Sequence, residues 1–212
     1  MARGLPAVWS TALGLIFGVV GIYLYVGQST HPSLFGAPFI LFGLFIIIIG
    51  AYVHFVAAPE PPSIQQDETI IETRSPTQKV AFLKIAVSLP ILLVAIYLLF
   101  FTLVPYVYPI VTLLLGLYLL SSGLLTYWKN TLTTYYVTTE RVIKAYRFIS
   151  LIQQEVPLNK VRGVEERRSF TETLVGLGNI RIASGGGGGT LEVVVKNIEN
   201  STDFADEIRN LL

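Results

Sequence analysis

Cysteine is absent from this chain of 212 residues. Its absence excludes disulfide bonds, thiolate metal sites and cysteine nucleophiles. Histidine occurs only twice, as His31 and His54, and neither has an acid nearby at a spacing that suits acid–base or nucleophilic catalysis. Clusters of metal-ligating residues are missing too. We therefore expect a protein that is not an enzyme, with no catalytic residues, no metal site and no cofactor.

Charged residues are also scarce. They make up 14% of the chain, whereas soluble domains carry roughly 25%. The shortage is concentrated before residue 129, and the charges are dense after it. This shift in composition predicts a membrane-embedded part that is followed by a domain in water.

Long hydrophobic runs fill the first part of the chain. A helix needs about 20 apolar residues to cross a hydrocarbon core about 30 Å thick, and it satisfies its backbone groups within one segment. We predict four transmembrane helices, at residues 7–26, 37–57, 84–104 and 107–127. No Asp or Glu lies within these runs, which argues against an ion path. Glycines predict close helix packing, and the candidates are Gly14, Gly18, Gly43, Gly50, Gly116 and Gly123.

The Lys and Arg residues near the helix ends predict the orientation, because such residues are enriched in cytoplasmic loops. Arg3 precedes the first helix, Arg74 and Lys79 lie between the second and third, and Lys129 follows the fourth. The two remaining loops, 27–36 and 104–107, contain neither residue type. We expect a multi-pass protein of the cell (plasma) membrane with both termini in the cytoplasm.

After residue 129 the sequence has the character of short strands. Residues 179–184 and 190–196 alternate apolar and other side chains, as in a half-buried antiparallel sheet. Further strands are predicted at 131–138, 142–148, 152–156 and 160–168, with a helical turn within 169–178. The glycine run at 184–189 is interpreted as a flexible hairpin connection, because a phosphate-binding loop needs a lysine and a following helix.

The last segment, residues 201–212, is predicted to be an amphipathic helix that closes the sheet. Phe204, Ile208 and Leu211 fall on one face, and residues 201–203 offer capping side chains. The predicted organisation is an N-terminal transmembrane hairpin at 1–58, a cytoplasmic linker at 59–83, a second hairpin at 84–128 and a small cytoplasmic domain at 129–212.

Several short motifs in this region are similar to those of a known family. The chain has Tyr135, Thr138, Glu140 and Arg141 in a Y-x-x-T-x-E-R pattern, then VPLNKVRGV at 156–164 and GLGNIRI at 176–182. An acidic segment, DETIIETRSP at 67–76, precedes the third predicted helix. These motifs resemble the YdbS-like bacterial pleckstrin-homology (PH) domain membrane proteins over residues 67–212. The resemblance implies a bent antiparallel sheet capped by a C-terminal helix, and it leaves the first hairpin unexplained.

Basic residues are concentrated in the first part of the predicted domain. Residues 129–196 carry ten Lys and Arg against six Asp and Glu. The candidates for binding lipid are Lys129, Arg141, Lys144, Arg147, Lys160 and Arg162. Anionic lipids attract such residues, but a solvated face with the usual cytoplasmic excess of positive charge explains them as well. We favour the second interpretation and leave the first open.

The expected function is that of a non-enzymatic membrane protein whose cytoplasmic PH-like domain serves assembly, protein-partner binding or binding of inner-leaflet lipid. The expected partners are membrane lipids, another copy of the chain or another membrane protein, and no nucleic acid. The alternative is a small transporter or channel component with a regulatory cytoplasmic cap. Polar stripes or acids within the membrane would favour that alternative, and the sequence has neither.

Overall fold

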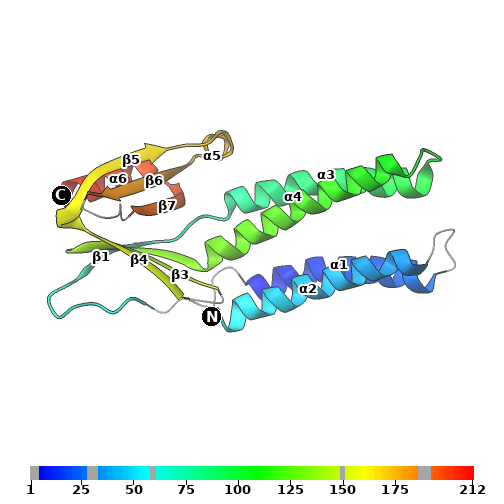
Figure 1. Ribbon diagram of the computed structural model, residues 1–212, viewed down its shortest axis with the longest axis horizontal. Coiled ribbons are helices and arrows are strands. Elements are labelled where there is room, and N and C mark those ends of the chain that lie inside the picture. Colours follow the sequence, from blue (N-terminus) through cyan, green and yellow to red (C-terminus); the bar gives the residue numbers. More distant parts are fainter. Residues whose placement is uncertain (1–4, 28–32, 58–60, 149–150, 186–191) are drawn as a thin grey trace. The chain divides into compact units, whose positions relative to one another are not determined.

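The structure is a computed structural model that describes residues 5–27, 33–57, 61–148, 151–185 and 192–212 (Figure 1). The chain divides into two compact units. The first comprises residues 1–60 together with 147–151, and the second comprises residues 61–146 together with 152–212. Part of the predicted glycine connection, residues 186–189, and the predicted strand residues 190–191 lie outside the described residues.

The first unit is built on a helical hairpin. Helix α1 (Pro6–Val26) is followed by a short 3-10 helix (Ser33–Phe35) and by α2 (Gly36–Phe55). The two helices approach closely at Gly14 and Gly43, since a Cβ added at Gly14 would lie 2.6 Å from the Gly43 carbonyl oxygen. Gly50 meets Ser10 in the same way, whereas a Cβ on Gly18 would meet no atom within 4 Å.

The second unit contains another helical hairpin, α3 (Lys79–Phe101) and α4 (Val107–Thr131). Helix α3 begins five residues before the predicted start, because Val80 and Ala81 are buried and extend the helix below the apolar run. It ends before Pro105, which disfavours helical backbone at the preceding residue.

Helix α4 continues past the predicted end at 127, because Trp128 and Asn130 are buried against the rest of the unit. Gly116 and Gly123 lie where α3 approaches α4, at Leu92 and Ile85.

All four long helices are long and apolar enough to span a membrane. Many of their large apolar side chains are exposed, among them Val19, Ile48, Leu93 and Leu114. Such surfaces are stable in lipid and not in water. The prediction of four membrane-spanning helices is therefore confirmed, with shifted ends for α3 and α4.

Among the described residues, seven strands form two antiparallel sheets, all of them after residue 69. The strands are β1 (Ile70–Arg74), β2 (Thr133–Thr138), β3 (Arg141–Arg147), β4 (Leu151–Pro157), β5 (Val161–Arg167), β6 (Leu177–Ser184) and β7 (Glu192–Glu199). The first sheet has the order β1-β2-β3-β4, and the second has the order β5-β6-β7. Short helices precede and follow β5, namely a 3-10 turn (Leu158–Lys160) and α5 (Phe170–Leu174).

Strand β1 lies in the segment 59–83, which the sequence analysis treats as a linker. It pairs with β2 in antiparallel register, so that Arg74 faces Tyr135 across the sheet. Along the chain, the whole α3–α4 hairpin is therefore inserted between two strands that pair with each other. The segment around β1 also holds the helix ends, because Asn130 donates to the Thr77 carbonyl (2.8 Å) and Gln78 donates to Thr131 Oγ1 (2.9 Å).

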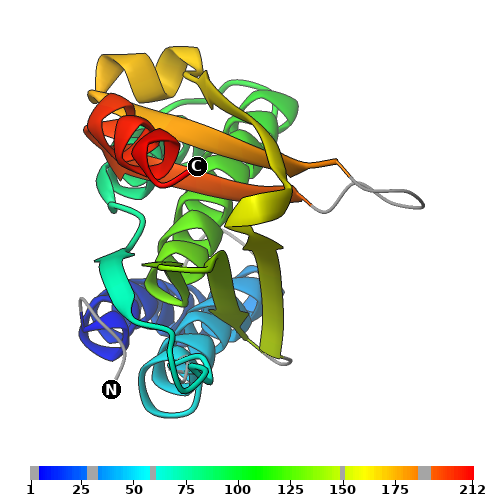
Figure 2. The same ribbon diagram turned by 90° about the vertical axis from the view of Figure 1, so that its left-hand side faces the viewer.

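Helix α6 (Ser201–Asn210) closes the hydrophobic core of the β-rich domain, and it lies across the three-stranded sheet (Figure 2). Phe204 and Ile208 are buried as predicted, against a core that includes Ile180, Ile182 and Val195.

Two details of the prediction for α6 are wrong. Leu211 is exposed because the helix ends at Asn210, and the cap residue is Asn200 in the left-handed conformation (φ 52°) rather than residues 201–203. Asparagine tolerates that conformation better than most residues.

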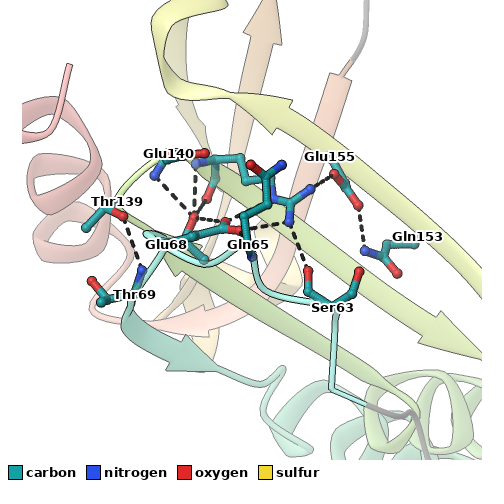
Figure 3. Close-up of polar contacts among 10 residues, drawn as sticks. Ser63, Gln65, Glu68, Thr69, Thr139, Glu140, Gln153 and Glu155 are labelled. Atoms are coloured by element: carbon teal, nitrogen blue, oxygen red, sulfur yellow. Dashed lines mark hydrogen bonds and ion pairs between the residues drawn. The ribbon is translucent and has the colours of Figure 1, made fainter.

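Arg141 is the centre of a polar network that joins the segment before β1 to strands β3 and β4. Figure 3 shows the surroundings of this network, with Glu68 and Glu155 labelled. Its Nε and Nη2 donate to the two carboxylate oxygens of Glu68, at 2.9 and 2.8 Å, and its Nη1 donates to Glu155 Oε2 at 2.5 Å. Thr138 Oγ1 donates to Glu68 at 2.6 Å. The Glu68 side chain has no exposed area, so its charge depends on these donors. The hydrogen bond from Arg141 outweighs desolvation and lowers the pKa of Glu68 from 4.5 to about 2.

The packing of α6 predicts the effect of removing Phe204. Phe204→Ala removes a fully buried ring, and such a deletion costs about 3–5 kcal/mol. We expect faster backbone hydrogen exchange in β6 and β7 of the full-length protein in detergent, measured by mass spectrometry. Leu211→Ala is the matched control, because Leu211 directly follows α6 and is exposed. Equal exchange in the two variants would contradict the role of α6.

The Glu68 network predicts a pH dependence of stability. Glu68 has a lowered pKa in the folded protein, so its ion pair stabilises the fold above pH 4.5 and loses this effect as the pH falls toward 2. Glu68→Gln removes the charge and keeps the shape. The melting temperature of the parent protein should exceed that of the variant at pH 7, and the difference should shrink as the pH falls below 4.5. A difference that stays constant between pH 7 and pH 3 would show that the charge of Glu68 is not what stabilises the network.

Candidate functional site: a lysine-lined cavity

A cavity of about 690 Å³ lies where helices α3 and α4 meet the β-rich domain. Its walls come from α3, α4, α5 and strands β2, β3, β4 and β7, all within the second unit. Four lysines line it, namely Lys84, Lys129, Lys144 and Lys196, and we call it the lysine cavity. The neutral polar side chains Asn130, Asn197 and Thr133 line it as well.

Two of the lysines come from the helices. Lys84 lies in the second turn of α3, and its ammonium group donates to Thr126 Oγ1 at 3.1 Å and to Ser122 Oγ at 3.4 Å, both on α4. Lys129 is exposed in the last turn of α4, where a positive charge also interacts favourably with the helix dipole. Both ammonium groups therefore stand at the end of the helical hairpin from which the β-rich domain begins.

The other two lysines come from the strands. Lys144 of β3 is half-buried, and burial, followed by the repulsion from Lys196, lowers its pKa below the ordinary value. Lys196 of β7 is held in place through its backbone, because its N–H donates to the Tyr135 hydroxyl at 3.0 Å. Burial in turn raises the pKa of Tyr135 to about 12, so this hydroxyl stays neutral. The cavity thus brings together two like charges, and the carboxylate of Glu172 lies within electrostatic reach of Lys196.

One acid, Glu172 of α5, also lines the cavity. Its carboxylate accepts hydrogen bonds from the Ser169 N–H (2.7 Å) and from Asn179 Nδ2 (2.7 Å). Burial alone would raise the pKa of Glu172, but these hydrogen bonds outweigh it and lower the pKa. Among the described residues no ion pair involves any of the four lysines. The cavity therefore carries an excess of positive charge.

The structure brings only two of the six predicted lipid-binding residues, Lys129 and Lys144, into the cavity. Arg141 is engaged by Glu68 and Glu155, and its side chain is only 15% exposed. Lys160 and Arg162 are exposed on the turn before β5 and on β5 itself, and do not line the cavity. Arg147 ends β3 and belongs to the first unit.

Sequence reasoning missed Lys84 and Lys196 as members of one site. For Lys84, the sequence feature that could have indicated a site was its position as the single charged residue at the start of a long apolar run. Lys196 follows the buried Val195 at an outward position of the alternating strand β7, which by itself indicates only a solvated surface. Among the described residues no group of His, Asp and Glu could hold a metal ion.

The donors in this cavity suit an anion. Ammonium groups donate charge-assisted hydrogen bonds to phosphate and carboxylate oxygens, and such bonds are about twice as strong as neutral ones. The neutral polar side chains at the same wall already donate within the protein: Asn130 to the Thr77 carbonyl, Asn197 to Asn130 Oδ1, and Thr133 to the Lys129 carbonyl. The arrangement therefore favours a ligand with negative charge.

Comparison with known proteins assigns this chain to a family. The family model described as "Bacterial PH domain" matches residues 80–212, which is more than half of the chain. The match includes helices α3 and α4 as well as strands β2 to β7 and α6. Comparisons with curated proteins and with solved structures find no match. The two antiparallel sheets, the closing helix α6 and the family match agree, and the protein belongs to the bacterial PH domain family.

Proposed function

We propose that this protein is a non-enzymatic membrane protein whose PH domain binds the anionic headgroups of the lipids around it. The observation that carries the proposal is the lysine cavity at the end of the α3–α4 hairpin, with four ammonium groups and one already engaged carboxylate. A PH domain on a separate soluble chain would have to find the membrane first. Here two spanning helices keep the site beside the bilayer.

The place of Lys84 supports a ligand that comes from the bilayer. Lys84 is the last charged residue of α3 before a run of uncharged residues that continues to the end of the helix. Lysines at such positions extend their ammonium groups toward the headgroup region. A cavity that includes this ammonium group lies at the depth of lipid phosphates, so a headgroup can enter it without leaving its leaflet.

Electrostatics favours anionic over zwitterionic lipid. Each Lys near an anionic leaflet contributes about 1 kcal/mol. An anion next to Lys144 and Lys196 would also relieve the repulsion and desolvation that lower the pKa of Lys144. We place the site in the inner leaflet of the plasma membrane, since the residues that flank the helices on this side are Arg74, Lys79 and Lys129.

Native mass spectrometry of the full-length protein in detergent tests lipid binding. Phosphatidylglycerol should bind more tightly than phosphatidylcholine. The double variant Lys144→Gln and Lys196→Gln loses about 2 kcal/mol of attraction, or roughly thirty-fold in affinity for phosphatidylglycerol.

The matched control is the double variant Lys160→Gln and Arg162→Gln, which removes the same charge outside the cavity. This control should bind phosphatidylglycerol like the parent. Equal losses in the two variants would indicate a diffuse charge effect and would overturn the proposed site. If neither variant changes binding, assembly with another protein becomes the better explanation of the PH domain.

The proposed orientation has its own test. Ser33 and Asp203 are both exposed in the structure, at opposite ends of the predicted topology, and the chain has no native cysteine. A membrane-impermeant thiol reagent should label Ser33→Cys in intact cells and should label Asp203→Cys only after permeabilisation. The opposite pattern would place the PH domain outside the cytoplasm.

A further inference from the structure

Helix α5, between β5 and β6, exposes two large apolar side chains. Phe170 is 79% exposed and Leu174 is 65% exposed, which makes them two of the most exposed apolar side chains of the β-rich domain. They are four residues apart in one helical segment, so both project from the same face. Water is an unfavourable surrounding for such a pair.

The local fold of α5 does not depend on burying these two side chains. Ser169 and Glu172 form a capping box at the start of the helix, and the Ser169 carbonyl accepts from the Thr173 N–H at 2.9 Å. Asn179 of β6 donates to Glu172 at 2.7 Å and ties the helix to the sheet. These polar contacts hold α5 in place with Phe170 and Leu174 directed away from the core.

The position of α5 is fixed relative to the helical hairpin of the same unit. Glu172 of α5 lines the lysine cavity together with Lys84 of α3 and Thr126 of α4. Lys84 marks the level at which the charged start of α3 gives way to the apolar run. Figure 1 shows α5 at the end of the β5–β6 pair that lies nearest to α3 and α4. A helix at this level lies at the surface of the bilayer that α3 and α4 span.

We infer that α5 is a membrane-inserting tip, and that Phe170 and Leu174 lie in the interfacial layer of the bilayer. The bilayer is the occupant that the geometry favours, because any bilayer around α3 and α4 extends sideways from them at the depth of α5. Aromatic and leucine side chains on one face of a helix are typical of such interfacial contacts. The PH domain then holds the membrane at two places, through the spanning hairpin and through α5.

The inference stands apart from lipid binding in the lysine cavity. Apolar insertion needs no anionic headgroup, so it should occur in neutral phosphatidylcholine as well as in anionic bilayers. Binding in the cavity depends on charge and should weaken with salt. Each of the two ideas therefore survives or fails without the other.

Site-directed spin labelling of the full-length protein in lipid nanodiscs tests the tip, and the lack of native cysteine leaves each introduced thiol as the single label. Phe170→Cys and Leu174→Cys place a nitroxide on α5. Leu114→Cys on the exposed surface of α4 is the reference for lipid, and Asp203→Cys on the exposed surface of α6 is the reference for water. All four positions are exposed, so the labels leave the core intact.

Labels at residues 170 and 174 should collide with oxygen several-fold more often than with a water-soluble nickel complex, relative to the label at residue 203. Neutral and anionic nanodiscs should give the same result. If both labels match the label at residue 203, α5 lies in water and the inference is wrong. Spin–spin broadening at residue 170 in nanodiscs with more than one copy would show that a second copy of the chain covers α5, and would also overturn it.

Discussion

The insertion of the α3–α4 hairpin between two neighbouring strands constrains the whole second unit. Antiparallel neighbours are commonly joined by a turn of a few residues, but β1 and β2 are joined by two membrane-spanning helices. Residues 75–78 connect β1 to α3, and a single residue connects α4 to β2. Asn130 of α4 donates to the Thr77 carbonyl, and Gln78 donates to Thr131 of α4, so hydrogen bonds join the two ends of the hairpin. Because the sheet is connected to the hairpin through both β1 and β2, it cannot rotate freely relative to α3 and α4. The lysine cavity is lined by residues from both sides of this junction.

The Arg141 network makes this insertion stable. The segment before β1 is otherwise held by an edge strand whose side chains are mostly exposed, and edge strands pair on one side only. Arg141 connects that segment to β3 and β4 through Glu68 and Glu155. The Y-x-x-T-x-E-R motif is explained by these contacts, because Thr138 and Arg141 both bind Glu68 and Tyr135 accepts from the backbone of β7. Thr138, Arg141 and Tyr135 thus hold strands together, and Tyr135 also lines the lysine cavity.

Features with a local signal could be predicted from the sequence. The four membrane helices follow from run length, and the burial of Phe204 and Ile208 follows from helical spacing. Strand β1 could not be predicted as part of the sheet, because IIETR is short, three of its five residues are polar, and its partner strand lies beyond the helical hairpin. Arg141 looked like a surface base because Glu68 stands far from it in sequence. The lysine cavity was hidden for the same reason, since its lysines come from four separate elements.

The proposed position of the bilayer relates the lysine cavity to the exposed apolar side chains of α5. Lys84 and Glu172 share a cavity, although one belongs to a spanning helix and the other to a connection between strands. In the arrangement proposed above, the bilayer around α3 reaches the level of α5, where Phe170 and Leu174 are exposed. Positive charge lines the cavity at this level, and apolar side chains project from α5 beside it. The two proposals together assign both surfaces to the boundary of the bilayer, because a lipid headgroup carries negative charge and the upper part of its chains is apolar.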